Sequence, residues 1–155
     1  MKKQFISILF LLITTVAIGQ EILIGKVVKV ADGDTITILT SDFSQVPIRL
    51  QGIDCPEKAQ DFGKVAKQFT SDLVFGKIVK VEVVDSDRYG RAIGIVTLPD
   101  GKVLNNELLK AGLAWHYIQY DHSKKMNDLE AQAKSKRLGL WLQPNAVAPW
   151  LFRRK

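Results

Sequence analysis

The sequence predicts an α+β protein built mainly from strands: a small, closed, five-stranded barrel of the OB type with three helices. Two observations predict this fold class. Five short segments are rich in β-branched residues or alternate apolar with polar residues, and three others repeat apolar residues with helical periodicity. The helical segments fall after the third and the fifth strand, an order that suggests a small closed barrel. The length of 155 residues suits one domain with a single core.

The first three strands are expected near the start of the folded chain. Residues 22–30 are rich in β-branched side chains and end at the turn signal Asp32-Gly33-Asp34. Residues 35–38 alternate strictly between threonine and isoleucine, as a half-buried strand does. A second turn at Ser41-Asp42 precedes the third strand, which we place at residues 46–50.

The pattern changes to helical periodicity at residues 63–74. Val65, Phe69 and Leu73 recur every four residues, and charged residues lie off that stripe. We therefore expect these three side chains to form the buried face of an amphipathic helix. Gly76 is a suitable stop for this helix.

The remaining elements follow in the second half of the chain. Valine alternates with charged residues at 79–83, and a turn at 85–90 leads to a fifth strand at 92–98. A short helix is predicted at 105–111. A longer one is predicted at 124–137, where the apolar residues share one face. The chain contains no internal repeat, low-complexity tract or interdomain linker.

Composition and charge exclude several classes of protein. The chain is 46% hydrophobic, which is too high for a disordered protein. Its single cysteine rules out an internal disulfide, and with only two histidines a zinc site built from these residues is not expected. Lys plus Arg number 22 against 16 Asp plus Glu, so the chain is basic, and this charge favours phosphate backbones.

The first 19 residues have the pattern of a signal peptide. Lys2 and Lys3 precede an apolar run at 5–18, which is too short to span a bilayer comfortably, and small residues precede a cleavage point after Gly19 or Gln20. The alternative is an uncleaved membrane anchor. We expect cleavage and export, to the periplasm or the medium, with no stable membrane association afterwards.

Three carboxylates stand at turns and strand ends rather than on solvated faces. Asp34 lies in the first hairpin turn, and Asp54 and Glu57 flank Cys55 and the stiff Pro56 after the third strand. Clustered carboxylates without histidine or cysteine support form a hard oxygen site, suited to Ca²⁺ or Mg²⁺. Each also has an ordinary alternative, because Asp-Gly is a common hairpin turn and Asp-x-Pro-Glu suits a helix start.

Two arginines stand near these carboxylates in the predicted barrel. Arg49 ends the third strand, and Arg91 follows Tyr89-Gly90 in the later hairpin. A guanidinium binds phosphoryl oxygens bidentately, so arginines beside a divalent cation suit a phosphoryl centre. The alternatives are an ion pair at the barrel edge for Arg49 and a solvated hairpin residue for Arg91.

Four ordered segments carry these residues: Asp32-Gly33-Asp34-Thr35, Ile48-Arg49-Leu50, Asp54-Cys55-Pro56-Glu57 and Asp87-Arg88-Tyr89-Gly90-Arg91. Parts of residues 106–114, 130–134 and 139–141 agree in the same order. Together they resemble the staphylococcal nuclease (thermonuclease) family, whose fold is an OB barrel with three helices. The resemblance places a nuclease domain at 22–143. It leaves a basic and aromatic tail at 144–155, which we expect to pack against the barrel.

The resemblance implies a calcium-dependent phosphodiesterase that acts on DNA and RNA. By position, Asp34 and Asp54 would bind Ca²⁺ through their carboxylates, and Cys55 through its main-chain carbonyl. Cys55 stands where the best-known member of the family has threonine. A main-chain ligand tolerates this change, which puts a free thiol near the site.

The resemblance also implies roles for the other site residues. Glu57 would activate the attacking water, and Arg49 and Arg91 would stabilise charge in the transition state. The family breaks the bond between phosphorus and the 5′ oxygen, which leaves 3′-phosphate products. Tyr117 and Tyr120 are candidates for packing around the terminal nucleotide.

Other functions remain open from the residues alone. OB folds also hold single strands or partner proteins without chemistry, so a non-catalytic binding module is the main alternative. A barrel that acts on sugars or peptides is a third possibility that nothing in the sequence requires. The presence of all five residues of catalytic type favours the enzyme. We expect a monomer, and we expect His116 and His122 to be surface residues, because no partner constellation surrounds them.

Overall fold

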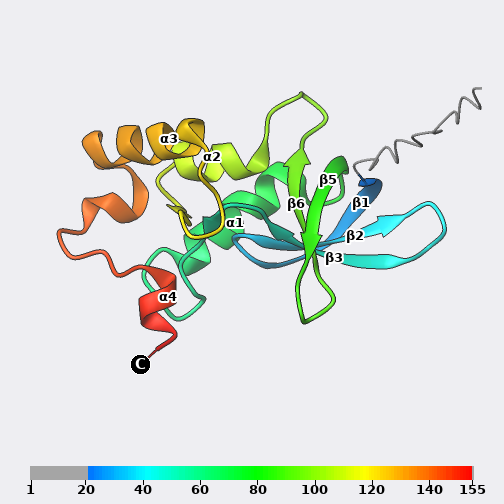
Figure 1. The fold of residues 1–155 in the computed structure, drawn as a ribbon, viewed down its shortest axis with the longest axis horizontal. Helices are drawn as coiled ribbons and strands as arrows, with labels where there is room; N and C mark the ends of the chain where they lie inside the picture. The colour runs from blue at the N-terminus through cyan, green and yellow to red at the C-terminus, as the bar shows by residue number, and fades with distance from the viewer. Residues whose placement is uncertain (1–20, 155) are drawn as a thin grey trace, which may run out of the picture.

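The computed structural model describes residues 21–154, so the predicted signal peptide at 1–19 lies outside the described residues. Five strands close into a barrel in the order β1-β2-β3-β6-β5 (Figure 1). Their bounds are Glu21–Asp32 for β1, Thr35–Thr40 for β2, Gln45–Leu50 for β3, Ile78–Ser86 for β5 and Ala92–Thr97 for β6. β3 and β6 run parallel, and the other neighbouring pairs run antiparallel. The predicted α+β barrel is therefore confirmed.

The barrel closes because β1 is long enough to pair with two neighbours. Its first half pairs with β5 and its second half with β2, and its register against β2 shifts twice, between Val27 and Lys29 and between Val30 and Asp32. Such irregularities bend a strand and increase its twist. The inward side chains fill the barrel, and those with no exposed surface include Val27, Ile36, Ile38, Ile48, Val81 and Val96.

The three predicted helices are present, and smaller elements join them. The helices are α1 (Gly63–Val74), α2 (Leu104–Lys110) and α3 (Lys124–Ser135). A two-stranded sheet of β4 (Ile53–Asp54) and β7 (Trp115–His116) was not predicted, and neither were the 3-10 helix at Gly139–Leu142 and α4 (Pro149–Phe152) in the tail. Across residues 21–154 no helix is long and apolar enough to span a bilayer.

The buried face of α1 differs from the predicted one. Val65 is 51% exposed, and Phe69 and Leu73 are only partly buried. The buried positions of the helix are Gly63, Ala66, Thr70 and Val74. These residues are smaller than Phe and Leu, and they let the helix backbone approach the barrel closely. The Thr70 hydroxyl donates a hydrogen bond to the Gly33 carbonyl at 2.5 Å. The prediction that Val65, Phe69 and Leu73 form the buried face of α1, which rested on hydrophobicity alone, was therefore wrong.

His116 is buried, which contradicts its predicted place on the surface. It is 4% exposed, because β7 pairs with β4 and lies against α3. Its Nε2 lies 3.0 Å from an Asp121 carboxylate oxygen, and its backbone N–H donates to the buried Glu130 carboxylate at 3.0 Å. His122 is exposed, as predicted.

Candidate active site

One cleft at the end of the barrel brings together all eight residues singled out from the sequence. It has a volume of about 950 Å³, and its walls come from the β1–β2 turn, β3, β4, the β5–β6 hairpin, the segment after β7 and the tail. The eight predicted residues that line it are Asp34, Arg49, Asp54, Cys55, Glu57, Arg91, Tyr117 and Tyr120. Asp54, Cys55 and Glu57 lie within one short segment, and the fold brings the other five residues, from positions 34 to 120, to the same cleft.

Arg49 joins the two aspartates of the cleft. Pairing of β2 with β3 places Thr35 opposite Arg49, so Asp34 lies beside the guanidinium. Arg49 Nη1 lies 2.5 Å from Asp34 Oδ2, and Nη2 donates to Asp54 Oδ1 at 2.7 Å. Gly52, whose φ is +72°, makes the turn that brings Asp54 back toward the end of β3. The ion pair proposed as an alternative for Arg49 therefore exists, and its partners are the two predicted metal ligands.

Burial and ion pairing act in opposite directions on the pKa values of this cluster. Asp54 is 1% exposed, and burial raises the pKa of its carboxyl despite the opposing effects of Arg153 and Arg49. Burial and the neighbouring carboxylates also raise the pKa of Asp32. For Arg49, burial acts to lower the pKa, but Asp34 and Asp54 outweigh it and the pKa is raised. The buried carboxylates of the cleft therefore stabilise the charged form of the Arg49 guanidinium beside them.

Cys55 contributes its backbone rather than its side chain to the cluster. Its N–H donates to Asp34 Oδ2 at 2.6 Å, whereas its thiol is buried. A methyl group at Gly33 would lie 2.9 Å from the Cys55 sulfur, so the thiol is packed under the β1–β2 turn. Burial raises the pKa of the thiol well above its usual value. The free thiol predicted near the site is therefore present, but it is protonated and enclosed.

The donor chemistry of the cleft fits a hard divalent cation. Asp34 and Asp54 are 5% and 1% exposed, and two buried carboxylates this close require compensating positive charge. Arg49 and Arg153 supply some of it in this structure. In the described part of the chain no three His, Cys, Asp or Glu side chains gather as a metal cluster. A bound ion would therefore need main-chain carbonyl and water oxygens besides the two aspartates.

Glu57 lies at the mouth of the cleft, on the segment between β4 and α1. Its backbone N–H donates to the Gln60 side chain at 2.8 Å. A methyl group at Gly63 would overlap the Glu57 carbonyl oxygen, so only glycine lets α1 begin against this segment. The Glu57 side chain is 35% exposed, and its Oε1 accepts a hydrogen bond from Arg153 Nη1 at 2.6 Å.

Arg91 lies in the cleft but stands apart from the carboxylate cluster. Its Nε donates to Asp87 Oδ2 at 2.7 Å, and this ion pair holds it at the base of the β5–β6 hairpin. Although burial would raise the pKa of Asp87, the hydrogen bonds from Arg91 and Tyr89 lower it. The side chain of Arg91 is 31% exposed. It is therefore a partly solvated arginine at the cleft wall, held in place by one carboxylate.

Tyr117 and Tyr120 form an aromatic wall after β7. Their rings meet edge to face with centroids 4.7 Å apart. Trp150 of α4 stacks on Tyr117 with a centroid distance of 4.7 Å and an interplanar angle of 9°. Tyr120 is 62% exposed and offers its ring to the cleft.

Sequence reasoning missed Arg153, although it lies among the predicted site residues. Its Nη2 lies 2.7 Å from Asp54 Oδ2, and its Nη1 lies 2.6 Å from Glu57 Oε1. Hydrogen bonds to these two carboxylates raise its pKa further above the usual range. The sequence signal was the combination of Pro149-Trp150 with terminal basic residues, which we interpreted only as packing and general positive charge.

Comparison with known proteins agrees with this geometry. The family described as "Staphylococcal nuclease homologue" matches residues 47–143. The chain belongs to the staphylococcal nuclease family. An "Uncharacterized endonuclease" of Escherichia coli O157:H7 is 42% identical over 131 residues, covering 84% of this chain and 85% of that protein. An "Uncharacterized endonuclease" of Haemophilus influenzae is 37% identical, with coverage of 99% and 86%. A "Micrococcal nuclease" of Shigella flexneri is 39% identical, with coverage of 84% and 80%.

Membership of this family confirms the resemblance and the prediction of a nuclease hydrolase. The matched residues include Arg49, Asp54, Glu57 and Arg91, whereas Asp34 precedes them in the β1–β2 turn. The tail lies beyond the matched residues, so Arg153 enters the cleft from outside the family domain.

Proposed function

We propose that this protein is an exported Ca²⁺-dependent nuclease that hydrolyses phosphodiester bonds of DNA and RNA. The observation that carries the proposal is the single cleft in which two buried aspartates, a half-exposed glutamate, two arginines and two tyrosines meet. The proposed export rests on the signal-peptide pattern at 1–19. We expect the protein to act as a monomer, because all proposed site residues come from one chain.

Asp34 and Asp54 would hold the calcium ion through their carboxylates, with the main-chain carbonyl of Cys55 as a further ligand. When bound, the ion would supply positive charge for the phosphate oxygens during the reaction. Asp34 and Asp54 are buried and contact Arg49 and Arg153 in this structure, so a bound ion would replace some of these contacts.

Glu57 has the place and exposure that a water-activating group needs. Its carboxylate stands at the open side of the cleft and is reachable by solvent and substrate, unlike the enclosed Asp54. A carboxylate here accepts a proton from a water that attacks the phosphorus. The bond between phosphorus and the 5′ oxygen then breaks, the 5′ oxygen takes a proton from solvent and leaves as a hydroxyl, and the 3′ side keeps the phosphate.

The two arginines would stabilise the negative charge that builds on the phosphate oxygens. A guanidinium can donate two parallel hydrogen bonds to such oxygens, and Arg49 would exchange part of its contacts with Asp34 and Asp54 to do so. Arg49 lies between the proposed metal ligands, and Arg91 immediately precedes β6, the strand that pairs with β3, so both guanidinium groups line the cleft in which a phosphate would bind. The exposed ring of Tyr120, supported by Tyr117, offers a stacking surface for a base.

Calorimetric titration with Ca²⁺ tests the proposed ligands directly. Asp34→Asn and Asp54→Asn each remove one anionic ligand, so calcium affinity should fall by on the order of tenfold or more. Asp42→Asn is the matched control. That carboxylate accepts hydrogen bonds in the β2–β3 turn, outside the cleft, and its loss should leave the affinity unchanged. If both cleft variants bound Ca²⁺ as tightly as the wild type, the carboxylates would be turn and ion-pair residues only.

A further inference from the structure

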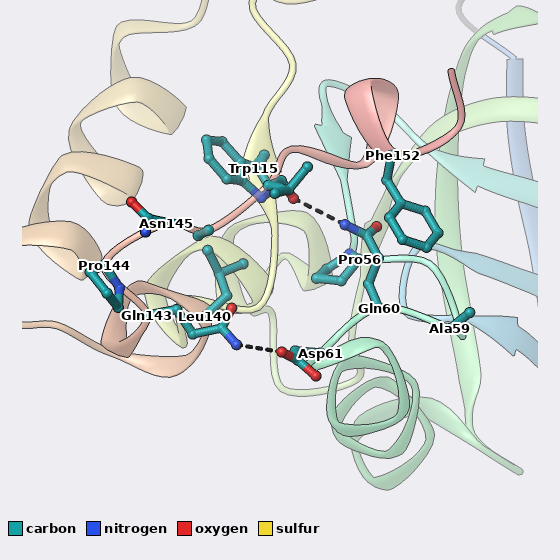
Figure 2. A pocket seen from close by; sticks show the side chains of 12 residues that line it. Pro56, Ala59, Gln60, Asp61, Trp115, Leu140, Gln143, Pro144, Asn145 and Phe152 are labelled. Atoms are coloured by element: carbon teal, nitrogen blue, oxygen red, sulfur yellow. Dashed lines mark hydrogen bonds between the residues drawn. The ribbon is translucent and has the colours of Figure 1, made fainter. Parts of the chain in front are cut away.

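The C-terminal tail is a docked part of the structure rather than a loose end. Ala148 and Pro149 are buried, and Trp150 packs against both Trp115 and Tyr117. Figure 2 shows Phe152 of α4 beside Pro56 and Gln60, with the tail backbone crossing Trp115. The Gln60 side chain donates to the Val147 carbonyl at 3.0 Å, which ties the tail to the segment that carries Glu57.

This docking delivers Arg153 to two carboxylates at once. One nitrogen of the guanidinium contacts Asp54 Oδ2 at 2.7 Å, and the other contacts Glu57 Oε1 at 2.6 Å. Asp54 is fixed on its other oxygen by Arg49, which in turn holds Asp34. The result is a row of alternating charges that runs from Asp34 through Arg49, Asp54 and Arg153 to Glu57.

The Glu57 carboxylate contacts this row through Arg153. Its side chain is 35% exposed, and within residues 21–154 the only ion-pair partner of its carboxylate is Arg153. A free glutamate side chain populates many rotamers, and ordering it costs up to about 2 kcal/mol. A water-activating carboxylate has to be in place before the reaction, and a misplacement of about 1 Å can cost on the order of 10²-fold in rate.

We propose that Arg153 is a positioning residue, supplied by the tail, that holds the Glu57 carboxylate beside Asp54 in the geometry for water activation. The inference rests on the proposed role of Glu57. It extends the active site beyond the matched family domain, since the group that orients Glu57 comes from the C-terminal tail. The Arg153 side chain is 43% exposed, but it differs from an ordinary surface ion pair because it also contacts the 1% exposed Asp54 and comes from a segment anchored by buried residues.

A double-mutant cycle measured by single-turnover cleavage tests this role. Arg153→Ala should lower the single-turnover rate at saturating enzyme by about 10–10²-fold. The steady-state KM should stay nearly unchanged, because the substrate still meets Arg49, Arg91 and the aromatic wall. In a Glu57→Gln background the same change should lower the rate by no more than about twofold, because Arg153 then has no water-activating carboxylate to position. A twofold difference is about the uncertainty of such double-mutant comparisons. Arg153→Lys should restore only part of the rate, because a single ammonium group cannot reproduce the separate guanidinium nitrogens that contact Asp54 and Glu57.

Arg154→Ala is the matched control, because it removes the same charge from the next position of the tail. Arg154 is exposed, and it forms no ion pair with another residue that the structure describes. Thermal melting of each variant checks the fold. Oligonucleotide binding in EGTA, measured by fluorescence anisotropy, should be similar for Arg153→Ala and Arg154→Ala.

The possible results separate the two proposals. A wild-type rate in Arg153→Ala, together with a large loss in Glu57→Gln, overturns the positioning role alone. A faster Arg153→Ala enzyme also overturns it and identifies Arg153 as a restraint on the carboxylates. An equal loss in both backgrounds means that Arg153 acts on the substrate or through Asp54, and overturns its proposed action through Glu57. A near-normal rate in Glu57→Gln overturns the proposed role of Glu57 and, with it, this inference.

Discussion

Replacing Glu57 by glutamine should lower the single-turnover cleavage rate by about 10²–10⁴-fold at saturating Ca²⁺. Glutamine keeps the size of the side chain and part of its hydrogen bonding to Arg153, but it cannot accept a proton from water. Nucleic-acid affinity should change far less, because attraction to phosphates comes from Arg49, Arg91 and the basic surface. Removal of a negative charge from the cleft can even tighten binding slightly.

Two assays on this variant decide the role of Glu57. Cleavage is followed in a single turnover, and binding is followed by fluorescence anisotropy of a labelled oligonucleotide. Glu107→Gln is the control, because it removes the same charge from α2, outside the cleft, where Glu107 pairs with Lys110. If Glu57 were only a carboxylate before a helix, its loss would cost about 0.3–1 kcal/mol of stability and leave the rate nearly intact. Near-wild-type cleavage therefore rules out the proposed role.

The two arginines should both be required for turnover but should differ in their effect on stability. Arg49→Ala and Arg91→Ala should each lower turnover by on the order of 10²-fold or more, because each removes a donor to charge that develops on the phosphate. Arg49→Ala should also reduce the free energy of unfolding by about 3 kcal/mol, since two buried carboxylates lose a shared partner. Arg91 is more exposed, so its loss should cost less than about 1 kcal/mol.

Single-turnover rates and thermal melting together check this contrast. Lysine at either position should rescue poorly, because an ammonium cannot reproduce the two parallel donors of the guanidinium. Arg137→Ala removes the same charge from a position two residues after α3, which is exposed and outside the cleft, and should change neither quantity much. A folded Arg49→Ala or Arg91→Ala enzyme with normal turnover would show that the arginine has no transition-state role.

The barrel was predictable because its signals are local. Alternation in β2 and turn residues such as Asp32-Gly33-Asp34 specify a strand pair without reference to the rest of the chain. The buried face of α1 was not predictable in the same way. Its inward positions hold smaller residues, such as Ala66 and Thr70, and this choice depends on how closely the helix approaches the Gly33 turn. His116 was misplaced for a similar reason, because its burial depends on the pairing of β7 with β4 and on packing against α3.

The candidate site also combines residues that local sequence patterns identify with a residue that only the tertiary fold brings into place. Asp54, Cys55 and Glu57 lie within one short segment, and their spacing around Pro56 was visible in the sequence. Arg153 is 99 residues from Asp54 and 96 residues from Glu57 in the sequence, and its contacts with them depend on how the tail docks on Trp115 and Tyr117. No local pattern specifies such a contact.

Incubation of the purified protein with plasmid DNA and with RNA, in Ca²⁺ or in EGTA, tests the central claim most directly. The proposed Ca²⁺-dependent nuclease should degrade both nucleic acids in Ca²⁺ and neither in EGTA. Binding without degradation in Ca²⁺ would contradict the account and support a non-catalytic OB module. Equal degradation in Ca²⁺ and in EGTA would contradict it differently, by showing that the cleft cuts nucleic acid without the cation proposed for Asp34 and Asp54.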